Sequence, residues 1–495
     1  MYNSCCLDVT VKNPELFGTI TFIFSERCYI IKTDVFYQRS GFEKMQKLEI
    51  NKNKFRTQVK FADKAARLVL GELFRNRRPA DRTLSGFFRE NRQCGSKDRQ
   101  FISESIYALL RYWGILRCFL PAERREELEK GNIRLGAQEL PALFFAALYL
   151  DFQFIPWADA LAAEVNIPWP KPANGPSASL LDRAEALAER FGHPGGFSLE
   201  MLVPEWVREK LPADFPMERF LDDLQRRPPM WLRAQCGDTA ELLDELAEAG
   251  LNFRIHEKME NAIAVENSRV NLFTLEAFRK GKFEVQDLAS QCIGLAANPK
   301  RKSRWWDACA GAGGKTLQLA DLMARTGTVV ASDIREYKLE DLRLRARRAG
   351  FPNIVTRPWD GRTVPPKQQQ KFDGVLVDAP CSCGGVWRRN PDGRWILTPE
   401  EITEAAKLQY DILSAASPAV APGGVLVYAT CSLFPEENQD VVNRFLTAHP
   451  EFSLEEFADP LTGKTVNGML QVYSFDGDCD CMFVSRMRRK GRDDE

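Results

Sequence analysis

Two cysteines that directly follow apolar segments are the side chains best suited to chemistry in this sequence. Cys381 follows "VLVDAP" (375–380), and Cys431 follows "GGVLVYAT" (423–430). Each apolar run predicts a strand that is covered on both faces. Open α/β sheets bind their ligands at the carboxyl ends of their strands. If the two strands are neighbours, both thiols face one crevice, where a thiolate could act as the nucleophile of covalent catalysis.

Three other roles for these thiols have to be weighed. Free cysteine also packs in cores as a small apolar residue. A disulfide is disfavoured, because the 13 cysteines lack framework spacing and the N-terminus shows no secretory signal. Zinc could take four thiolates from "CSC" (381–383) and "CDC" (479–481), but structural zinc usually needs about two to four residues between paired ligands. Acid–base chemistry falls to Cys, Asp, Lys or water, because these motifs contain none of the 3 histidines, His193, His256 and His449.

A glycine-rich turn, "DACAGAGGKT" (307–316), follows the first predicted strand of the same part of the chain. Glycines let a ligand approach the backbone and the amides at a helix start. A phosphate loop would use the run 314–316, with "GVLVD" (374–378) as its magnesium-holding strand, but Cys309 stands where that motif needs glycine. A nucleoside cofactor fits better, because Asp333 ends the next strand, where an acid can bind ribose hydroxyls.

A thiolate beside a methyl donor is what methylation of carbon 5 of a pyrimidine requires. Carbon 5 is a poor nucleophile until a thiolate adds to carbon 6 and makes the ring enamine-like, so that carbon 5 can attack a sulfonium methyl group. A base must then remove the carbon 5 proton, so that the thiol is eliminated. The target base must also leave its stack to reach the pocket.

The elements that must position these residues predict an α/β fold. From residue 291 to 490 the predicted strands alternate with helices, which favours a doubly wound, mostly parallel sheet. A helix is predicted at 316–326. The strands are predicted at 304–310, 327–333, 353–358, 372–380, 423–430 and 481–487.

The preceding regions show other patterns. Residues 54–190 have apolar residues at helical spacing and predict an all-α domain, with a Pro- and Gly-rich break at 167–177. Residues 1–53 remain an unassigned leader. Residues 200–290 predict a small α+β unit, with strands at 228–235 and 261–266 and a helix at 239–250.

Composition limits the class of protein. Hydrophobic residues make up 44% and charged residues 27% of the chain, as in ordinary soluble proteins, and the longest apolar run is too short to span a bilayer. We therefore expect a cytoplasmic protein without membrane contact. The net charge is +0, so nucleic-acid binding must come from local basic patches such as "FRNRRPADR" (74–82) and "RLRARRAG" (343–350).

Four motifs make the sequence recognisable: "DACAGAGGKT", "VDAPCS", "RRNPDGRW" and "GGVLVYATCSLFPEEN". Together they resemble the RNA cytosine-5 methyltransferases of the Sun (Nop/Nsun) family, over roughly residues 55–490. The resemblance implies a class I, Rossmann-like methyltransferase domain, with residues 54–190 as a NusB-like RNA-binding domain. It implies S-adenosyl-L-methionine as the cofactor and RNA as the partner, more specifically ribosomal RNA of the small subunit, with transfer RNA as the alternative. We expect a monomer without a metal.

The resemblance also implies roles for single residues. Cys431 would be the nucleophile, Cys381 would assist release of the product, and Asp378 would lie near the sulfonium and the target base. The residues alone do not rank the two thiols, and an idle RNA-binding or assembly factor on the same scaffold is the alternative class. Asp333 would hold the ribose and Asp360 would contact the adenine region. The methionine part of the cofactor would lie against Cys309, Ala310, Gly311, Ala312, Gly313, Gly314 and Lys315.

Overall fold

The computed structural model describes residues 24–25, 28–29, 52–151, 155–172, 174, 178–235, 239–266 and 270–492. Most of the unassigned leader, residues 1–53, lies outside the described residues. Contacts divide the chain into two units, Met1–Ile50 and Asn51–Glu495. In the first unit β1 (Phe24–Ser25) pairs with β2 (Cys28–Tyr29). All elements described below belong to the second unit.

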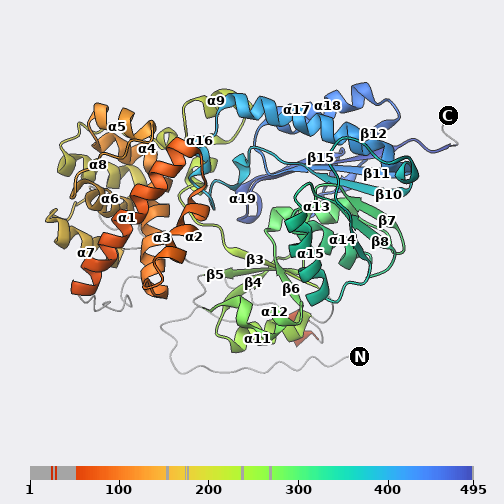
Figure 1. The fold of residues 1–495 in the computed structure, drawn as a ribbon, viewed down its shortest axis with the longest axis horizontal. Helices are drawn as coiled ribbons and strands as arrows, with labels where there is room; N and C mark the ends of the chain where they lie inside the picture. The colour runs from red at the N-terminus through yellow and green to blue at the C-terminus, as the bar shows by residue number, and fades with distance from the viewer. Residues whose placement is uncertain are drawn as a thin grey trace. The chain divides into compact units, whose positions relative to one another are not determined.

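An all-α region begins the second unit, as the helical spacing predicted, and is drawn in red to yellow in Figure 1. The predicted break at 167–177 lies between its last two helices. Arg111 and Asp151 form a buried ion pair in this region. The helices are α1 (Lys52–Asn76), α2 (Ala80–Glu90), α3 (Ser96–Arg111), α4 (Trp113–Leu116), α5 (Ala122–Glu129), α6 (Glu139–Asp151), α7 (Ile155–Val165) and α8 (Leu180–Phe191), with the 3-10 turn η1 (Arg117–Phe119).

A small antiparallel sheet follows, after a link of η3 (Leu199–Leu202), α9 (Trp206–Lys210) and α10 (Met217–Asp223). The strand order is β4-β5-β3-β6, and every pair in it is antiparallel. The sequence predicted β3 and β5 but not β4 and β6, which are short and lack a buried apolar run. The unit contains β3 (Met230–Ala234), α11 (Thr239–Glu248), β4 (Asn252–Ile255), β5 (Ala262–Glu266), η4 (Leu272–Thr274), α12 (Glu276–Arg279) and β6 (Phe283–Val285).

A second, mostly parallel sheet carries the two cysteine-bearing strands. Its order is β12-β16-β11-β10-β7-β8-β9, with β15 paired to β16. The five strands from β11 to β9 in this order are parallel, whereas β16 is antiparallel to β11. All six predicted strands are present, and the predicted doubly wound α/β fold is confirmed. The strands are β7 (Arg304–Asp307), β8 (Thr328–Ala331), β9 (Ile354–Thr356), β10 (Phe372–Asp378), β11 (Val420–Thr430), β12 (Phe452–Leu454), β15 (Met469–Val472) and β16 (Met482–Arg489); β13 (Phe457–Ala458) pairs separately with β14 (Thr465–Val466).

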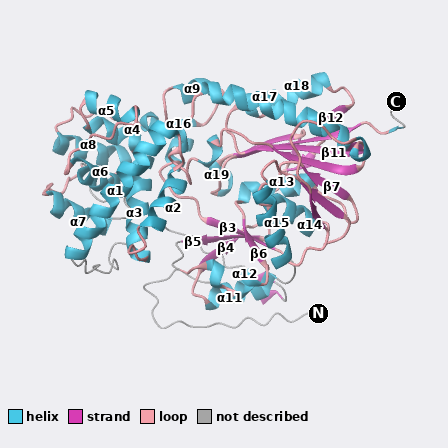
Figure 2. Ribbon diagram, viewed as in Figure 1, coloured by secondary structure: helices cyan, strands magenta, loops and turns pink. Residues whose placement is uncertain are grey.

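Helices cover both faces of this sheet, as Figures 1 and 2 show. One face packs against α13 (Leu288–Ala297), α14 (Gly314–Leu322) and α15 (Glu336–Arg348), and the other against α17 (Pro399–Ala416) and α18 (Gln439–Ala448). Because successive strand residues point to opposite faces, Trp305 belongs to the first core and Trp306 to the second. This double cover explains the apolar runs from which the strands were predicted.

Short helical turns complete the part of the chain that contains the mostly parallel sheet. They are η5 (Pro366–Gln368), η6 (Gly384–Val386), α16 (Gly393–Ile396), η7 (Ser417–Ala419), η8 (Pro435–Glu437) and α19 (Ser474–Gly477). Across the described ranges, every helix falls short of the length and apolar character that a membrane crossing needs. The expected cytoplasmic location stays a prediction.

The "RRNPDGRW" motif docks on the helical region. Arg394, 0% exposed, donates a hydrogen bond to the carbonyl of Arg111 at 2.6 Å. The indole N–H of Trp395 donates to the carbonyl of Leu110 at 2.6 Å. Both carbonyls belong to the last turn of α3, where a helix leaves its carbonyls without helical partners. The motif therefore satisfies the end of α3, a role that the sequence did not predict.

Trp395→Phe tests this docking, because it removes the indole N–H and keeps an aromatic ring. We expect the free energy of unfolding to fall by about 1–3 kcal/mol, since the Leu110 carbonyl loses its donor. Urea denaturation measures the change. Trp359→Phe is the matched control: its indole donates to the exposed carbonyl of Thr363 at 2.8 Å, which water can replace. Equal losses in the two variants would contradict a docking role for Trp395.

Candidate active site

The carboxyl ends of β10 and β11 bring the two predicted cysteines together. The strands are parallel, with Asp378 opposite Ala429, and each cysteine lies in the loop just beyond its strand. The Sγ atoms of Cys381 and Cys431 are 3.2 Å apart, which is hydrogen-bond distance for two thiols. Both thiols are free and half-buried, so they border the surface rather than the closed core. The strands are neighbours, as a shared crevice requires.

A third cysteine joins this pair. The Sγ atoms of Cys381, Cys383 and Cys431 all lie within 4.8 Å of one another. The other cysteines of the four-thiolate zinc alternative, Cys479 and Cys481, are buried and are not members of this cluster. The grouping of "CSC" with "CDC" is therefore not the one that the structure forms.

Hydrogen bonds among the three thiols shift their pKa values in opposite directions. Bonds with Cys381 and Cys431 lower the pKa of Cys383 to about 3. Bonds with Cys383 and Cys431, together with burial, raise the pKa of Cys381. The bond with Cys381 acts to lower the pKa of Cys431, but the Cys383 thiol and burial outweigh it and raise that pKa. The cluster therefore favours one negative charge, which belongs to the group as a whole.

A buried carboxylate ties the two cysteine loops together. Glu437, 0% exposed, lies in the "PEEN" turn that follows Cys431. Its Oε1 accepts hydrogen bonds from Ser382 N–H and Gln409 Nε2, both at 2.8 Å. Its Oε2 accepts from the hydroxyls of Ser382 and Ser432. Because these serines directly follow the two paired thiols, Glu437 fixes the spacing of the loops. The sequence did not predict this role, although a Pro-Glu-Glu turn after a cysteine-bearing strand was an available signal.

The predicted cofactor turn lies between β7 and α14. The N–H of Gly311 donates to Oδ2 of Asp333 at 2.9 Å, which ties the turn to the end of β8. Gly313 has φ 90°, and a side chain there would meet Leu342 at 2.5 Å, so only glycine fits. Within the described part of the chain, no atom outside the adjoining backbone and the two neighbouring residues lies within 4 Å of a Cβ placed on Gly311 or Gly314. This open space beside the start of α14 fits a nucleoside cofactor.

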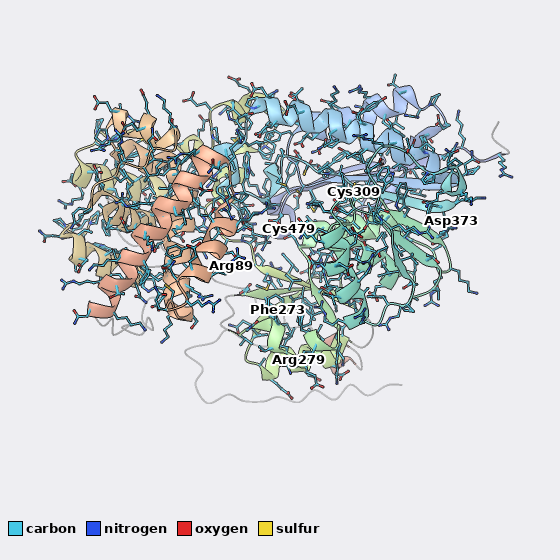
Figure 3. The ribbon with its side chains drawn as sticks, in the orientation of Figure 1. Arg89, Phe273, Arg279, Cys309, Asp373 and Cys479 are labelled. Atoms are coloured by element: carbon cyan, nitrogen blue, oxygen red, sulfur yellow. The ribbon has the colours of Figure 1, made fainter. Side chains whose placement is uncertain are left out.

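The protein itself holds the remaining residues of the turn. The N–H of Ala310 donates to the Ser332 carbonyl at 2.7 Å, and Arg345 donates to the Ala312 carbonyl at 2.7 Å. Cys309 is half-buried, and burial raises the pKa of its thiol. Figure 3 labels Cys309 in the part of the chain that contains the mostly parallel sheet. Cys309 therefore contributes shape to the turn rather than charge.

An ion pair links the cofactor turn to the thiol loop. Nζ of Lys315 lies 2.8 Å from Oδ2 of Asp378. Burial acts to lower the pKa of Lys315, but the Asp378 carboxylate outweighs it and the pKa is raised. The ammonium group thus stays charged and holds Asp378 between the turn and Cys381. At the end of β7, burial raises the pKa of Asp307 to about 7, and the Thr316 hydroxyl donates to its carboxylate at 2.6 Å.

The two other predicted cofactor acids differ in their surroundings. Asp333 is 5% exposed, and its two oxygens accept hydrogen bonds from the Arg335 guanidinium at 3.0 and 3.1 Å. Burial acts to raise the pKa of Asp333, but the hydrogen bonds from Arg335 outweigh it and lower the pKa. Asp360 is exposed, and its Oδ1 accepts from Arg362 N–H at 3.0 Å. The structure brings Asp333 to the glycine turn, whereas the adenine contact of Asp360 stays a prediction.

Comparisons with known proteins identify the family and the fold. The family "16S rRNA methyltransferase RsmB/F" matches residues 294–488, and the "Methyltr_RsmF/B-like, ferredoxin-like domain" matches residues 203–271. The crystal structure of PH0851 has a TM-score of 0.64 at 22% identity and covers 90% of this chain and 100% of that one. NSun6 from Pyrococcus horikoshii with SFG has a TM-score of 0.50 at 21% identity and covers 58% and 98%. The fold is that of a class I methyltransferase.

Two relatives extend the comparison. Ribosomal RNA small subunit methyltransferase B of Salmonella paratyphi C (strain RKS4594) is 36% identical over 289 residues, 57% of this chain. The protein of the same name from Yersinia pestis bv. Antiqua (strain Angola) is 36% identical over 296 residues, 58% of this chain and 67% of its own. The chain belongs to the RsmB/F methyltransferase family, which confirms S-adenosyl-L-methionine as the cofactor. It spans 64% of the length of the Salmonella protein.

Glu437→Gln tests the carboxylate that joins the cysteine loops. The amide cannot accept all of the hydrogen bonds that the carboxylate accepts, so we expect the free energy of unfolding to fall by about 1–3 kcal/mol. The alkylation rates of Cys381 and Cys431 should change with it, and mass spectrometry measures them. The control Glu436→Gln removes the partly exposed ion pair with Lys210, at a cost below about 1 kcal/mol, and keeps an oxygen that can accept from the Thr403 hydroxyl. If both variants left the alkylation rates of Cys381 and Cys431 unchanged, Glu437 would not position the loops.

Proposed function

We propose that this protein transfers a methyl group from S-adenosyl-L-methionine to carbon 5 of a cytosine in RNA, through a covalent adduct with Cys431. The observation that supports this best is the 3.2 Å separation of the Cys381 and Cys431 sulfurs beside the cofactor turn. RNA binding alone needs neither thiol. Carbon 5 chemistry needs one thiol to add to the ring and a second group to help it leave.

Each group of the site has a part in this reaction. Bound S-adenosyl-L-methionine supplies an electrophilic methyl group, for which the turn leaves room and Asp333 offers an acceptor to the ribose hydroxyls. Sγ of Cys431 bonds to carbon 6 of the cytosine, and the electron pair of the carbon 5–carbon 6 double bond moves to carbon 5. Asp378, which is paired with Lys315, would lie near both the sulfonium and the target cytosine. Carbon 5 then takes the methyl group, and the donor sulfur keeps the bonding electron pair and leaves as a thioether. Cys381 assists transfer of the carbon 5 proton to solvent, the double bond re-forms, and the sulfur–carbon 6 bond breaks with its electron pair returning to Cys431.

Local charge supports RNA as the substrate. A groove of about 700 Å³ on α2 and α3 is lined by Arg89, Arg92 and Arg99 together with Phe88, against a single acid, Asp81. The Arg99 guanidinium lies over the Phe88 ring, 5.3 Å from its centroid. Arginines contact phosphates, and exposed aromatic or guanidinium planes stack on unpaired bases. Figure 3 labels Arg89 on this helical region, which we propose as the RNA-binding domain implied by the NusB-like resemblance.

The proposed RNA is ribosomal RNA of the small subunit, because both curated relatives carry that description. Transfer RNA is the alternative substrate. We also propose a monomer that acts in the cytoplasm. A non-catalytic assembly factor is disfavoured by the presence of both thiols, Asp378 and the glycine turn, which binding alone does not require.

Cys381→Ala should leave attack and methyl transfer intact and stop elimination. An RNA adduct through Cys431 should then accumulate and survive denaturing gels with labelled RNA. Cys431→Ala should abolish methylation and form no adduct, and the double variant should form none, because the trapped bond needs the Cys431 sulfur. Cys118→Ala, which changes a thiol of the helical region, should methylate like the wild type.

Two other patterns on the same gels would contradict these roles. An adduct in Cys431→Ala, but not in Cys381→Ala, would mean that Cys381 is the nucleophile. If the thiols only filled the core, neither variant would trap RNA, and both would lose a similar amount of folding free energy.

Asp333→Ala removes the proposed ribose acceptor. Binding of S-adenosyl-L-methionine should weaken by about 1.5–3 kcal/mol, the scale of hydrogen bonds to charged groups. Calorimetry measures the affinity, and Asp341→Ala, which removes an exposed carboxylate from α15, should leave it unchanged. Tight magnesium-dependent ATP binding would instead support the phosphate-loop alternative.

A further inference from the structure

A metal ion fits the same cluster of thiols. We propose that Cys381, Cys383 and Cys431 form a site for a thiophilic d10 cation such as Zn²⁺, and that the bound ion blocks the nucleophile. The binding stands on the arrangement of the sulfurs alone. Only its effect on methylation rests on the proposed function.

The separations of the sulfurs are close to those around one ion. Zinc–thiolate bonds are about 2.3 Å long, so three thiolates around one zinc lie about 3.8–4.0 Å apart. Here the three Sγ atoms lie within 4.8 Å of one another, with Cys381 and Cys431 at 3.2 Å. A shift of less than about 1 Å in each separation would give the spacing of zinc-bound thiolates. Three protein ligands leave a fourth position for solvent, as in open rather than structural zinc sites.

Solvent access and a firmly held loop both favour a bound ion. Cys383 is exposed, which gives the ion a path from solvent. The loop is also anchored, because Gly385 N–H donates to the Cys431 carbonyl and Cys481 N–H donates to the Gly385 carbonyl, both at 2.9 Å. A side chain at Gly385 would meet the Cys481 carbonyl at 2.1 Å, so this close packing needs glycine. The ligands are therefore held near their positions before an ion arrives.

The backbone conformation of Cys383 is one that favours glycine, so the cysteine at this position needs another explanation, which its sulfur provides. Its φ is 59°, in the left-handed region that favours glycine. A cysteine here accepts steric strain and supplies the third sulfur of the cluster. Thiolates select zinc or copper(I) over magnesium or calcium, which defines the class of ion.

Metal binding and attack on cytosine exclude one another. The ion displaces the protons of the thiols, which pass to solvent, and accepts an electron pair from each sulfur. Cys431 needs the same electron pair to bond to carbon 6. The occupied site is therefore a reversibly inhibited state of the enzyme.

Zinc alone, without RNA or cofactor, tests the site on the whole protein. Alkylation of individual cysteines is followed by mass spectrometry, with a phosphine reductant present to keep the thiols reduced. We expect Zn²⁺ to slow alkylation of Cys381, Cys383 and Cys431 together, and a chelator to restore the rates. Cd²⁺ in place of Zn²⁺ should add thiolate-to-metal absorption in the ultraviolet.

Variants at Cys383 decide whether three sulfurs act together. Cys383→Ser and Cys383→Gly should lower the Zn²⁺ affinity roughly tenfold or more, since even residues behind the ligands change metal affinity by 10–100-fold. The glycine variant suits the left-handed backbone, so a folding defect cannot explain its loss. Cys118→Ser, a matched change of a thiol outside the cluster, should bind zinc like the wild type.

Three results would overturn the site. The first is that Zn²⁺ does not protect the thiols of the wild type from alkylation. The second is that both Cys383 variants bind Zn²⁺ as tightly as the wild type, and the third is that Cys118→Ser loses as much Zn²⁺ affinity as they do. The proposed function fails separately. An RNA adduct in Cys381→Ala without zinc protection of the wild type would remove the metal site and keep the methyltransferase. Protection without any adduct would support the metal site and remove its inhibitory role.

Discussion

Parallel pairing of β10 with β11 is the constraint on which the site depends. Its register sets Asp378 beside Ala429, so the loops that leave the two strands start side by side. A slip of one residue would turn every side chain of one strand to the opposite face and separate the two loops. The double cover of the sheet by helices prevents such a slip, because each strand face is buried against its own core.

Charge inside the site is held in pairs and networks that join neighbouring elements. Lys315 on α14 and Asp378 on β10 connect the cofactor turn to the thiol loop. Glu437 is buried where a lone carboxylate would be costly, and hydrogen bonds from Ser382, Ser432 and Gln409 offset that cost. Removing one of these partners would leave a buried polar atom unpaired, so the two halves of the site are stabilised as one network.

The parallel sheet could be predicted because burial on both faces leaves continuous apolar runs. The prediction that Cys381 and Cys431 lie close together needed one further assumption, that their strands are neighbours in the sheet. The role of Glu437 could not be predicted, because its partner Ser382 is 55 residues away and periodicity reports only local structure. The grouping of Cys383 with these two thiols could not be predicted, because zinc-ligand spacing concerns cysteines that are close in sequence. Here two of the sulfurs come from "CSC" and the third, Cys431, follows the other strand, 50 residues beyond Cys381.

The docking of "RRNPDGRW" on the helical region joins parts of the chain that are synthesised far apart in time. The N–H of Ala80 donates to Asp392 across 312 residues, and Arg394 donates to the Arg111 carbonyl across 283. During translation the helical region emerges first, before its donors in the later domain exist. Until they emerge, the end of α3 has only water as a partner. The helical region is therefore completed by a segment that is translated later, and the two regions mature together.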